Sequence, residues 1–425
     1  MTHPYFDYVH RTALEHFLRF VSYDTQSDPT SHSSPSTISQ VHFIQLLSSE
    51  LRSVGYCPIL SDSCTLYVCL PATNGLGDVE GVSFLAHIDT SPDCNGSNVN
   101  PVIHRNYQGG TIKFDSDPLL ELTQSHDPSL ANYIGEDIIT SDGTTLLGAD
   151  DKAGVAALFT VLLAIKRFKL PHGPLSICFT CDEEIGRGSR NVDLDLVYPL
   201  SFTVDGGEEG SFTLDCFDAW GCSVVFEGFA IDPSNGHDKL VNASLEVCRF
   251  VSMISSSFRV PEHSHGLDNF VYVKRISGNC EYAEVYLHLR SFYENDNCRV
   301  RRCIENLAEY FENSRPGLKV TVTFKHQYPN MGKFFDCKNR REFVENLLST
   351  AISIIGLTPK LSSFRGGTDG CYLCQRGVLC ANIFNGGHLF HSMREFCPSS
   401  GPGNCAKAVL AVIDLLQAGF AKFLK

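Results

Sequence analysis

Two consecutive stretches decide the fold: residues 146–168, LLGADDKAGVAALFTVLLAIKRF, and residues 175–186, LSICFTCDEEIG. The first stretch is a turn that leads into a long helix, apolar on all sides and therefore expected to be buried. The second stretch is an apolar strand that ends in acidic residues. A buried helix followed directly by a buried strand is typical of a mostly parallel sheet with helices packed against it.

Strands and helices alternate on either side of this pair. Further apolar strands that end in polar residues are GVSFLAHID (81–89), SFTVDGGEEG (201–210) and VLCANIFNGG (378–387). Helical periodicity covers residues 10–22, 38–54, 341–355 and the chain from about 403. The sequence therefore predicts an α/β fold whose mixed, mostly parallel sheet carries helices on both faces. The Ser- and Pro-rich run at 27–37 is expected to be a mobile loop.

The pattern changes between residues 213 and 332. Strand-like segments such as GCSVVFEGF and EYAEVYLHLRSF alternate there with helical segments such as RRCIENLAEYFENS. This composition predicts a ferredoxin-like α+β domain, inserted into the first domain as a lid. We therefore expect one domain made of 1–212 and 333–425, and a second at 213–332.

Composition excludes several classes of protein. The net charge of −14 argues against a nucleic-acid partner, which needs a positive surface. The longest apolar run, 154–165, is shorter than the roughly 20 residues that cross a bilayer, so we expect no membrane partner. The N-terminal sequence has no secretory signal, and a cytoplasmic location is expected.

Cysteine is abundant, with 18 residues. Many lie inside apolar runs and are interpreted as buried reduced thiols. The pairs Cys178/Cys181 and Cys371/Cys374 have zinc-ribbon spacing. However, residues three apart in a strand point to opposite faces, which disfavours the first pair as ligands of one metal.

Potential metal ligands follow three separate apolar strands. His87 and Asp89 follow the first, Glu183 and Glu184 the second, and Asp205 the third. The carboxyl ends of parallel strands meet at one edge of a sheet, where ligands bind. Each element alone is more often a solvated turn or a cap than a ligand, but all of them at equivalent strand ends predict a metal site.

Two other segments add donors to this edge. Asp150 and Asp151 start the long helix, and either His388 or His391 follows the last predicted strand. Carboxylates packed this closely would repel one another, and divalent cations remove that conflict. Imidazole with carboxylate favours two ions of zinc, cobalt or manganese.

Long motifs in the chain resemble those of the aminoacylase/carboxypeptidase superfamily of di-zinc peptidases. They are HID, LGADDKAG, TCDEEIG, FTVDGG, RGGTDG and NIFNGG followed by a His, and the resemblance runs from about Phe20 to the C-terminal helix. TSPDCNGSNVNP, YQGG and TTLLGADDKAG are most similar to the tripeptide aminopeptidases of that superfamily. The resemblance implies a metallo-exopeptidase that removes the N-terminal residue of tripeptides or short peptides. It also implies two Zn²⁺ ions (or Co²⁺ or Mn²⁺) and a homodimer formed through the lid.

The resemblance further assigns roles to the clustered residues. His87, Asp150 and Asp205 would hold one metal, and Asp150, Glu184 and His391 the other, with Asp150 as the bridge. His391 is preferred to His388 because it aligns without a gap. Asp89 would orient the His87 ring. Glu183 would be the general base for a metal-bridged hydroxide, and the Asp150–Asp151 peptide is expected to be cis. Asp at 205, rather than Glu, is similar to the aminopeptidase and dipeptidase members.

The lid departs from the family pattern. Asp232 stands where relatives have a His that helps to stabilise the oxyanion, and an anion there has the wrong sign. His237 could reach in from a reshaped loop, or Asp232 could be protonated or ion-paired. The third reading is a weakened, metal-containing homologue that binds peptides or regulates. A dipeptidase or deacylase of the same superfamily is a further alternative.

Three other residues are expected near the substrate. Asn242 and Arg290 match family positions, although Ser291 replaces the usual Asp after the Arg. Arg365 is a candidate anchor for a substrate carboxylate, or else part of a structural salt bridge.

Overall fold

The protein is described by a computed structural model, which covers residues 4–336 and 339–419. The chain divides into two compact units, each described here by itself. Unit 1 comprises the chain up to Leu214, Phe334–Ser362 and the chain from Thr368, and unit 2 comprises Asp215–Lys333 and Ser363–Gly367. The segment Ser363–Gly367 was expected in the first domain. It belongs to unit 2 because Arg365 donates hydrogen bonds to the carbonyl oxygens of Gly266 and Asp268.

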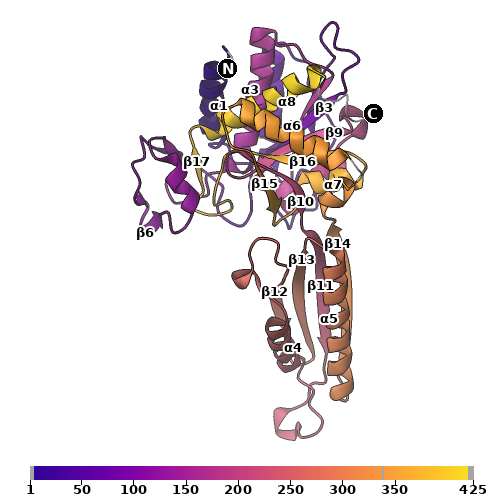
Figure 1. Ribbon diagram of the computed structural model, residues 1–425. Coiled ribbons are helices and arrows are strands. Elements are labelled where there is room, and N and C mark those ends of the chain that lie inside the picture. Colours follow the sequence, from indigo (N-terminus) through magenta and orange to yellow (C-terminus); the bar gives the residue numbers. More distant parts are fainter. Residues whose placement is uncertain (1–3, 337–338, 420–425) are drawn as a thin grey trace. The chain divides into compact units, whose positions relative to one another are not determined.

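An eight-stranded mixed sheet forms the centre of unit 1, in the order β1-β2-β8-β3-β9-β16-β10-β15 (Figure 1). The four central strands run parallel: β8 (Leu175–Thr180), β3 (Val82–His87), β9 (Leu200–Gly206) and β16 (Leu379–Phe384). On one side β2 (Leu66–Leu70) pairs antiparallel with β8, and β1 (Ile59–Leu60) pairs antiparallel with β2; on the other side β10 (Ser211–Cys216) pairs antiparallel with β16. β15 (Lys360–Phe364) is the last strand in the order. The predicted α/β class and the mixed sheet with a parallel centre are confirmed.

Helices cover this sheet. They are α1 (Phe6–Phe20), α2 (Ile38–Ser53), α3 (Ala149–Phe168), α6 (Arg340–Ile354), α7 (Asp369–Gln375) and α8 (Gly401–Gln417). α3 packs against β3 and β9, α1 and α8 pack against α3, and α7 packs against β9 and β16. Almost every side chain of α3 is buried, as its apolar sequence predicts. The first helix begins at Phe6, earlier than the periodicity indicated.

A small lobe of unit 1 was not anticipated. One sheet joins β17 (Phe396–Pro398), β7 (Ile138–Thr140) and β4 (Val102–His104), and another pairs β5 (Ile112–Phe114) with β6 (Asp117–Leu122). The lobe has its own apolar core, which includes Leu122, Leu130 and Phe396. Short 3₁₀ helices of unit 1 are η1 (Pro128–Tyr133), η2 (Glu183–Ile185), η3 (Gly188–Asn191) and η4 (Leu194–Leu196).

Unit 2 is a four-stranded antiparallel sheet with two long helices. In chain order its elements are β11 (Asp218–Glu227), α4 (Ala243–Ser257), β12 (Phe270–Gly278), β13 (Tyr282–Ser291), α5 (Glu294–Ser314) and β14 (Lys319–Tyr328). The strand order β12-β13-β11-β14 with this connectivity is ferredoxin-like. Both helices pack over a core that includes Phe226, Phe250 and Leu287. Short 3₁₀ helices are η5 (Pro233–Asn235), η6 (Pro261–His263) and, at the boundary of the units, η7 (Met331–Phe334).

The loop expected to be mobile is anchored at several points. Ser36 donates from its backbone and its hydroxyl to the Asp182 carboxylate, and Arg187 donates to the carbonyl oxygens of Ser31 and Ser33. The cysteines of residues 4–336 and 339–419 are free thiols. Over the same residues, no helix is long and apolar enough to cross a membrane.

Candidate active site

The carboxyl ends of the parallel strands bring the expected donors together. His87 ends β3, Asp205 lies near the end of β9, and Glu183 and Glu184 follow β8. Among the described residues, two groups place their donor atoms within 4.8 Å of one another. One group is His87, Glu183 and Asp205, and the other is His87, Asp150 and Glu184. Neither group contains a cysteine.

Asp150 lies between two imidazole rings. Its Oδ1 is 2.9 Å from Nε2 of His87, and its Oδ2 is 3.3 Å from Nε2 of His391. Each ring also faces a second carboxylate: His87 is 3.6 Å from Asp205 Oδ1, and His391 is 3.0 Å from Glu184 Oε2. One carboxylate therefore serves two histidine–carboxylate pairs. The Asp150–Asp151 peptide is cis, as expected.

The two candidate histidines of the 385–393 segment have different surroundings. His391 reaches Asp150 and Glu184 from a turn in which its own φ is +60°. His388 is buried elsewhere: it contacts Asp127, accepts or donates a bond with the Tyr133 hydroxyl at 2.8 Å, and stacks on Phe396. The structure thus brings His391, and not His388, to the cluster.

Asp89 makes two kinds of contact. Its Oδ1 lies 3.5 Å from Nδ1 of His87, and its backbone carbonyl is 3.0 Å from the same nitrogen. In addition, its two carboxylate oxygens accept the backbone N–H groups of Glu183 (3.0 Å) and Glu184 (3.1 Å). Asp89 therefore holds both the His87 ring and the acidic turn. The second of these contacts was not anticipated from the sequence.

The site concentrates negative charge away from water. Burial and the nearby Asp150 charge raise the pKa of Glu184 to about 8. Burial likewise raises the pKa of Asp205 to about 7 and holds that of Glu183 well above its usual range. Burial would lower the pKa of His391, but the hydrogen bonds that its ring donates to Asp150 and Glu184 raise this pKa to about 12. Ionised carboxylates here need compensating positive charge.

The donor set fits divalent cations. Two imidazoles and several carboxylates are the ligands that zinc-type ions prefer. Oε1 of Glu184 has no hydrogen-bond partner among the described residues, and the side chain is only 6% exposed. A buried carboxylate oxygen of this kind is normally satisfied, and a cation would satisfy it.

Two further buried acids lie next to the donors in the sequence: Asp182, to which sequence reasoning assigned no role, and Asp151, which was expected only as a donor at the start of the long helix. Asp182 is fully buried and accepts bonds from Ser36 and from Nε2 of Gln40 (2.8 Å). Asp151 is also fully buried and accepts from Asn385 Nδ2 at 3.0 Å. Both lie beside predicted ligands in the sequence, but nothing in the sequence indicates these distant partners.

The lid candidates of unit 2 lie in an exposed segment. Asp232 caps η5, and its carboxylate accepts the backbone N–H of Ser234 at 2.8 Å. The hydrogen bond from the Ser234 hydroxyl lowers the pKa of Asp232, so this side chain stays ionised and the protonated alternative is disfavoured. The His237 side chain is 96% exposed and lies 3.3 Å from Asp238.

The remaining candidates have structural contacts within unit 2. Asn242 caps α4 by accepting the backbone N–H of Leu245 at 3.3 Å. Arg290 donates to the carbonyl oxygens of Trp220 and Leu289. Arg365 donates to Ser264 Oγ at 2.6 Å as well as to the carbonyl oxygens noted above. Among the described residues, these bonds of Arg365 go to neutral oxygens and do not form the structural salt bridge that was one of its two readings.

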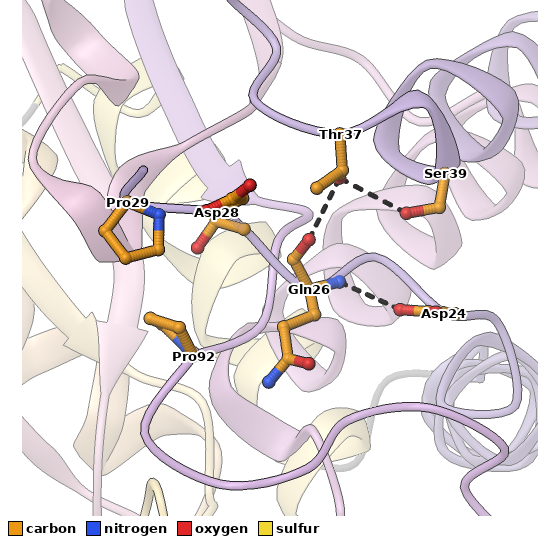
Figure 2. A pocket seen from close by; sticks show the side chains of 8 residues that line it. Asp24, Gln26, Asp28, Pro29, Thr37, Ser39 and Pro92 are labelled. Carbon is orange, nitrogen blue, oxygen red and sulfur yellow. Dashed lines mark hydrogen bonds between the residues drawn. The ribbon is translucent and has the colours of Figure 1, made fainter. Parts of the chain in front are cut away.

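A separate hollow opens beside the start of α2 (Figure 2). It is lined by Asp24, Gln26, Ser27, Asp28, Pro29, Thr37, Ser39 and Pro92. Its polar groups bond to one another: Thr37 Oγ1 donates to the Gln26 carbonyl at 2.9 Å, and Ser39 Oγ donates to Thr37 Oγ1 at 3.2 Å. None of the expected site residues lines this hollow.

Comparison with known proteins agrees with this architecture. Residues 147–417 match the model of "Peptidase family M20/M25/M40". The chain is 35% identical to peptidase T of Parabacteroides distasonis and 33% identical to that of Escherichia coli K12, over 95% of this chain and 98% of each relative.

Solved structures show the same fold. The aminopeptidase PepT of Bacillus cereus aligns with a TM-score of 0.73 at 20% identity, covering 96% of this chain and 98% of that one. A tripeptidase of Staphylococcus aureus gives the same TM-score and identity, with 96% and 99% coverage. A dinuclear metal-binding peptidase of Bacillus subtilis aligns at 0.65 and 11% identity, with 97% and 99% coverage. The chain therefore belongs to peptidase family M20/M25/M40 and is a hydrolase of peptide bonds.

Proposed function

We propose that this protein is an aminopeptidase that removes the N-terminal residue from tripeptides or short peptides with the help of two divalent cations, most readily Zn²⁺. The position of Asp150 between the rings of His87 and His391 carries the proposal, because one shared carboxylate between two histidine–carboxylate pairs suits two neighbouring ions. The relatives named peptidase T supply the substrate class.

The resemblance implies the two ligand sets, and the contacts of Asp150 with His87 and His391 support them. His87, Asp150 and Asp205 would hold one ion, and Asp150, Glu184 and His391 the other. Bound there, the ions would polarise the scissile carbonyl and make an attacking water more acidic. Asp89 would fix the His87 ring, because both its carboxylate and its carbonyl oxygen face Nδ1.

Glu183 is proposed as the general base. It would take a proton from the attacking water and pass it to the leaving amine. Burial raises the pKa of Glu183 above the usual range of a glutamate, which favours a carboxyl group that holds the proton before it passes it to the amine. However, Glu183 also lies within ligand distance of His87 and Asp205, so a role as a metal ligand is the competing reading.

Glu183→Gln separates the two readings. A general base contributes about 10²- to 10⁴-fold to rate, and we expect a loss of that size with two equivalents of Zn²⁺ retained. Glu246→Gln is a matched control, because Glu246 is a buried glutamate of unit 2 that pairs with Arg249. Loss of metal together with activity would identify Glu183 as a ligand, and an unchanged rate would refute any catalytic role.

The second candidate function is a weakened homologue that binds peptides without efficient turnover. The ionised Asp232, exposed in unit 2, favours it, since the resemblance implies a His at this position. Asp232→His should then raise kcat by about 10²- to 10³-fold, the usual value of one oxyanion donor. Asp238→His in the same loop is the control. No gain would assign the donor role to His237 or to another residue, which His237→Ala would test.

The domain roles belong to the same proposal. Residues 1–212 and 333–425 would form the catalytic domain, and 213–332 a lid through which two copies form a homodimer. Sedimentation of the purified protein tests the dimer. A panel of tripeptides, dipeptides and acyl-amino acids separates the aminopeptidase from a dipeptidase or deacylase.

A further inference from the structure

Glu395 is a buried acid that points at backbone rather than at the cluster of donors. Its side chain is 1% exposed, as expected only for a well-paired carboxylate. Oε2 accepts the N–H groups of Leu147 and Gly148, both at 2.8 Å, and Oε1 accepts the N–H of Asp150 at 3.1 Å. One carboxylate therefore binds three amides of the segment that leads into α3.

This segment has no other ready source of acceptors. The first amides of a helix lack partners within the helix. Leu147 and Gly148 are buried, and Gly148 has a φ of +82°, so the chain turns sharply there. Donors buried in this way need an acceptor from elsewhere in the fold. Glu395 provides it across more than 240 residues of sequence.

The turn that carries Glu395 also carries His391. The turn is closed by the Glu395 N–H, which donates to the Ser392 carbonyl at 3.1 Å, and by His391 and Leu389, both with positive φ. The same turn thus presents an imidazole to Oδ2 of Asp150 and a carboxylate to the backbone N–H of Asp150. The side chain and the main chain of Asp150 are held from one element.

We infer that Glu395 is a positioning residue, whose carboxylate fixes the backbone of Asp150 so that the two oxygens of Asp150 face His87 and His391. The inference rests on the proposed function, since it concerns the carboxylate proposed to bridge two cations. Within the described part of the chain, the carboxylate of Glu395 bonds to backbone amides and not to the donor atoms of the cluster. Its contribution is the geometry of the shared ligand.

Glu395→Gln tests this role with metal affinity as the readout. The amide keeps the shape but replaces one acceptor oxygen by a donor, which opposes the N–H groups it faces. Metal-free protein is titrated with Zn²⁺ against a competing chelator. Removal of a residue that orients a ligand typically weakens metal binding about 10- to 100-fold, and we expect such a loss for both ions because both share Asp150.

Asp218→Asn is the control for a purely structural effect. Asp218 is a buried acid of unit 2 that accepts bonds from Trp220, Asn297 and His326. The Asp218→Asn variant should have a lower melting temperature but an unchanged affinity for Zn²⁺. Wild-type affinity in Glu395→Gln would overturn the inference, even if that variant loses as much thermal stability as the control.

Hydrogen exchange on the unmodified, metal-free protein provides a test that needs no variant. The amides of Leu147, Gly148 and Asp150 should exchange as slowly as those of β3, because the carboxylate holds them. Exchange as fast as in the exposed Asp232 loop would overturn the inference. Failure of the wild type to bind two equivalents of Zn²⁺ would instead refute the proposed function, and the exchange rates would still decide whether Glu395 fixes Asp150.

Discussion

Asp150→Asn should remove both metal ions at once, whereas Asp205→Asn should weaken only one. The oxygens of Asp150 are 2.9 Å from His87 and 3.3 Å from His391, so the side chain faces both proposed ion sites. Asp205 approaches only His87 of these two rings, at 3.6 Å. The two substitutions remove the same charge and differ in whether the lost ligand is shared.

The expected magnitude follows from this sharing. Loss of an orienting partner weakens metal affinity about 10- to 100-fold, and loss of a ligand should weaken the affinity for each ion at least as much. At 1.36 kcal/mol per tenfold, this is about 1.4–2.7 kcal/mol of binding free energy per ion. For Asp150→Asn the cost applies to both ions and totals about 2.7–5.4 kcal/mol on the same scale. For Asp205→Asn it applies once.

The assay is metal content after equilibration at one controlled concentration of free Zn²⁺. The concentration is chosen so that the wild type retains two equivalents and Asp205→Asn retains one. Asp150→Asn should then retain none, with activity lost in parallel. If Asp150→Asn keeps one tightly bound ion, Asp150 is not shared, and the assignment of two ligand sets is refuted.

Two further predictions concern protons and packing. Zn²⁺ binding at pH 6 should release protons, because Glu184 and Asp205, with pKa values of about 8 and 7, are protonated in the metal-free protein and must ionise to bind. The pKa values of Glu184 and Asp205 in the folded state lie above their unfolded values of 4.5 and 3.8, so the folded state binds more protons. The stability that these two groups contribute to the metal-free protein therefore falls as the pH rises from about 4 to 8. Calorimetry in buffers of different ionisation enthalpy measures the release, and an equal release at pH 6 and pH 9 would contradict it. Gly154→Ala in α3 should lower the melting temperature, because the new Cβ would lie 2.4 Å from the Val204 carbonyl oxygen. Alanine by itself favours a helix, so a higher melting temperature would contradict this packing.

Local sequence was sufficient for the elements that depend on local pattern. The apolar run of α3 and the strands β3, β8 and β9, which lead to the donors, could be predicted because burial leaves a periodic signature in the residues themselves. The strand β12 was missed because most of its side chains are exposed, so no apolar alternation marks it. Likewise, the composition of the 27–37 loop did not reveal that Asp182 and Arg187 anchor it.

The sequence by itself therefore determined the class of fold, the strand ends that carry the donors and, through its motifs, the family. Only the tertiary structure decided how those donors are held. It turned the carboxylate of Asp89 to the amides of Glu183 and Glu184, and it brought Glu395 to the amide of Asp150. A carboxylate that binds the backbone of a distant segment recognises N–H groups that every residue except proline carries, so neither partner leaves a mark in the sequence of the other.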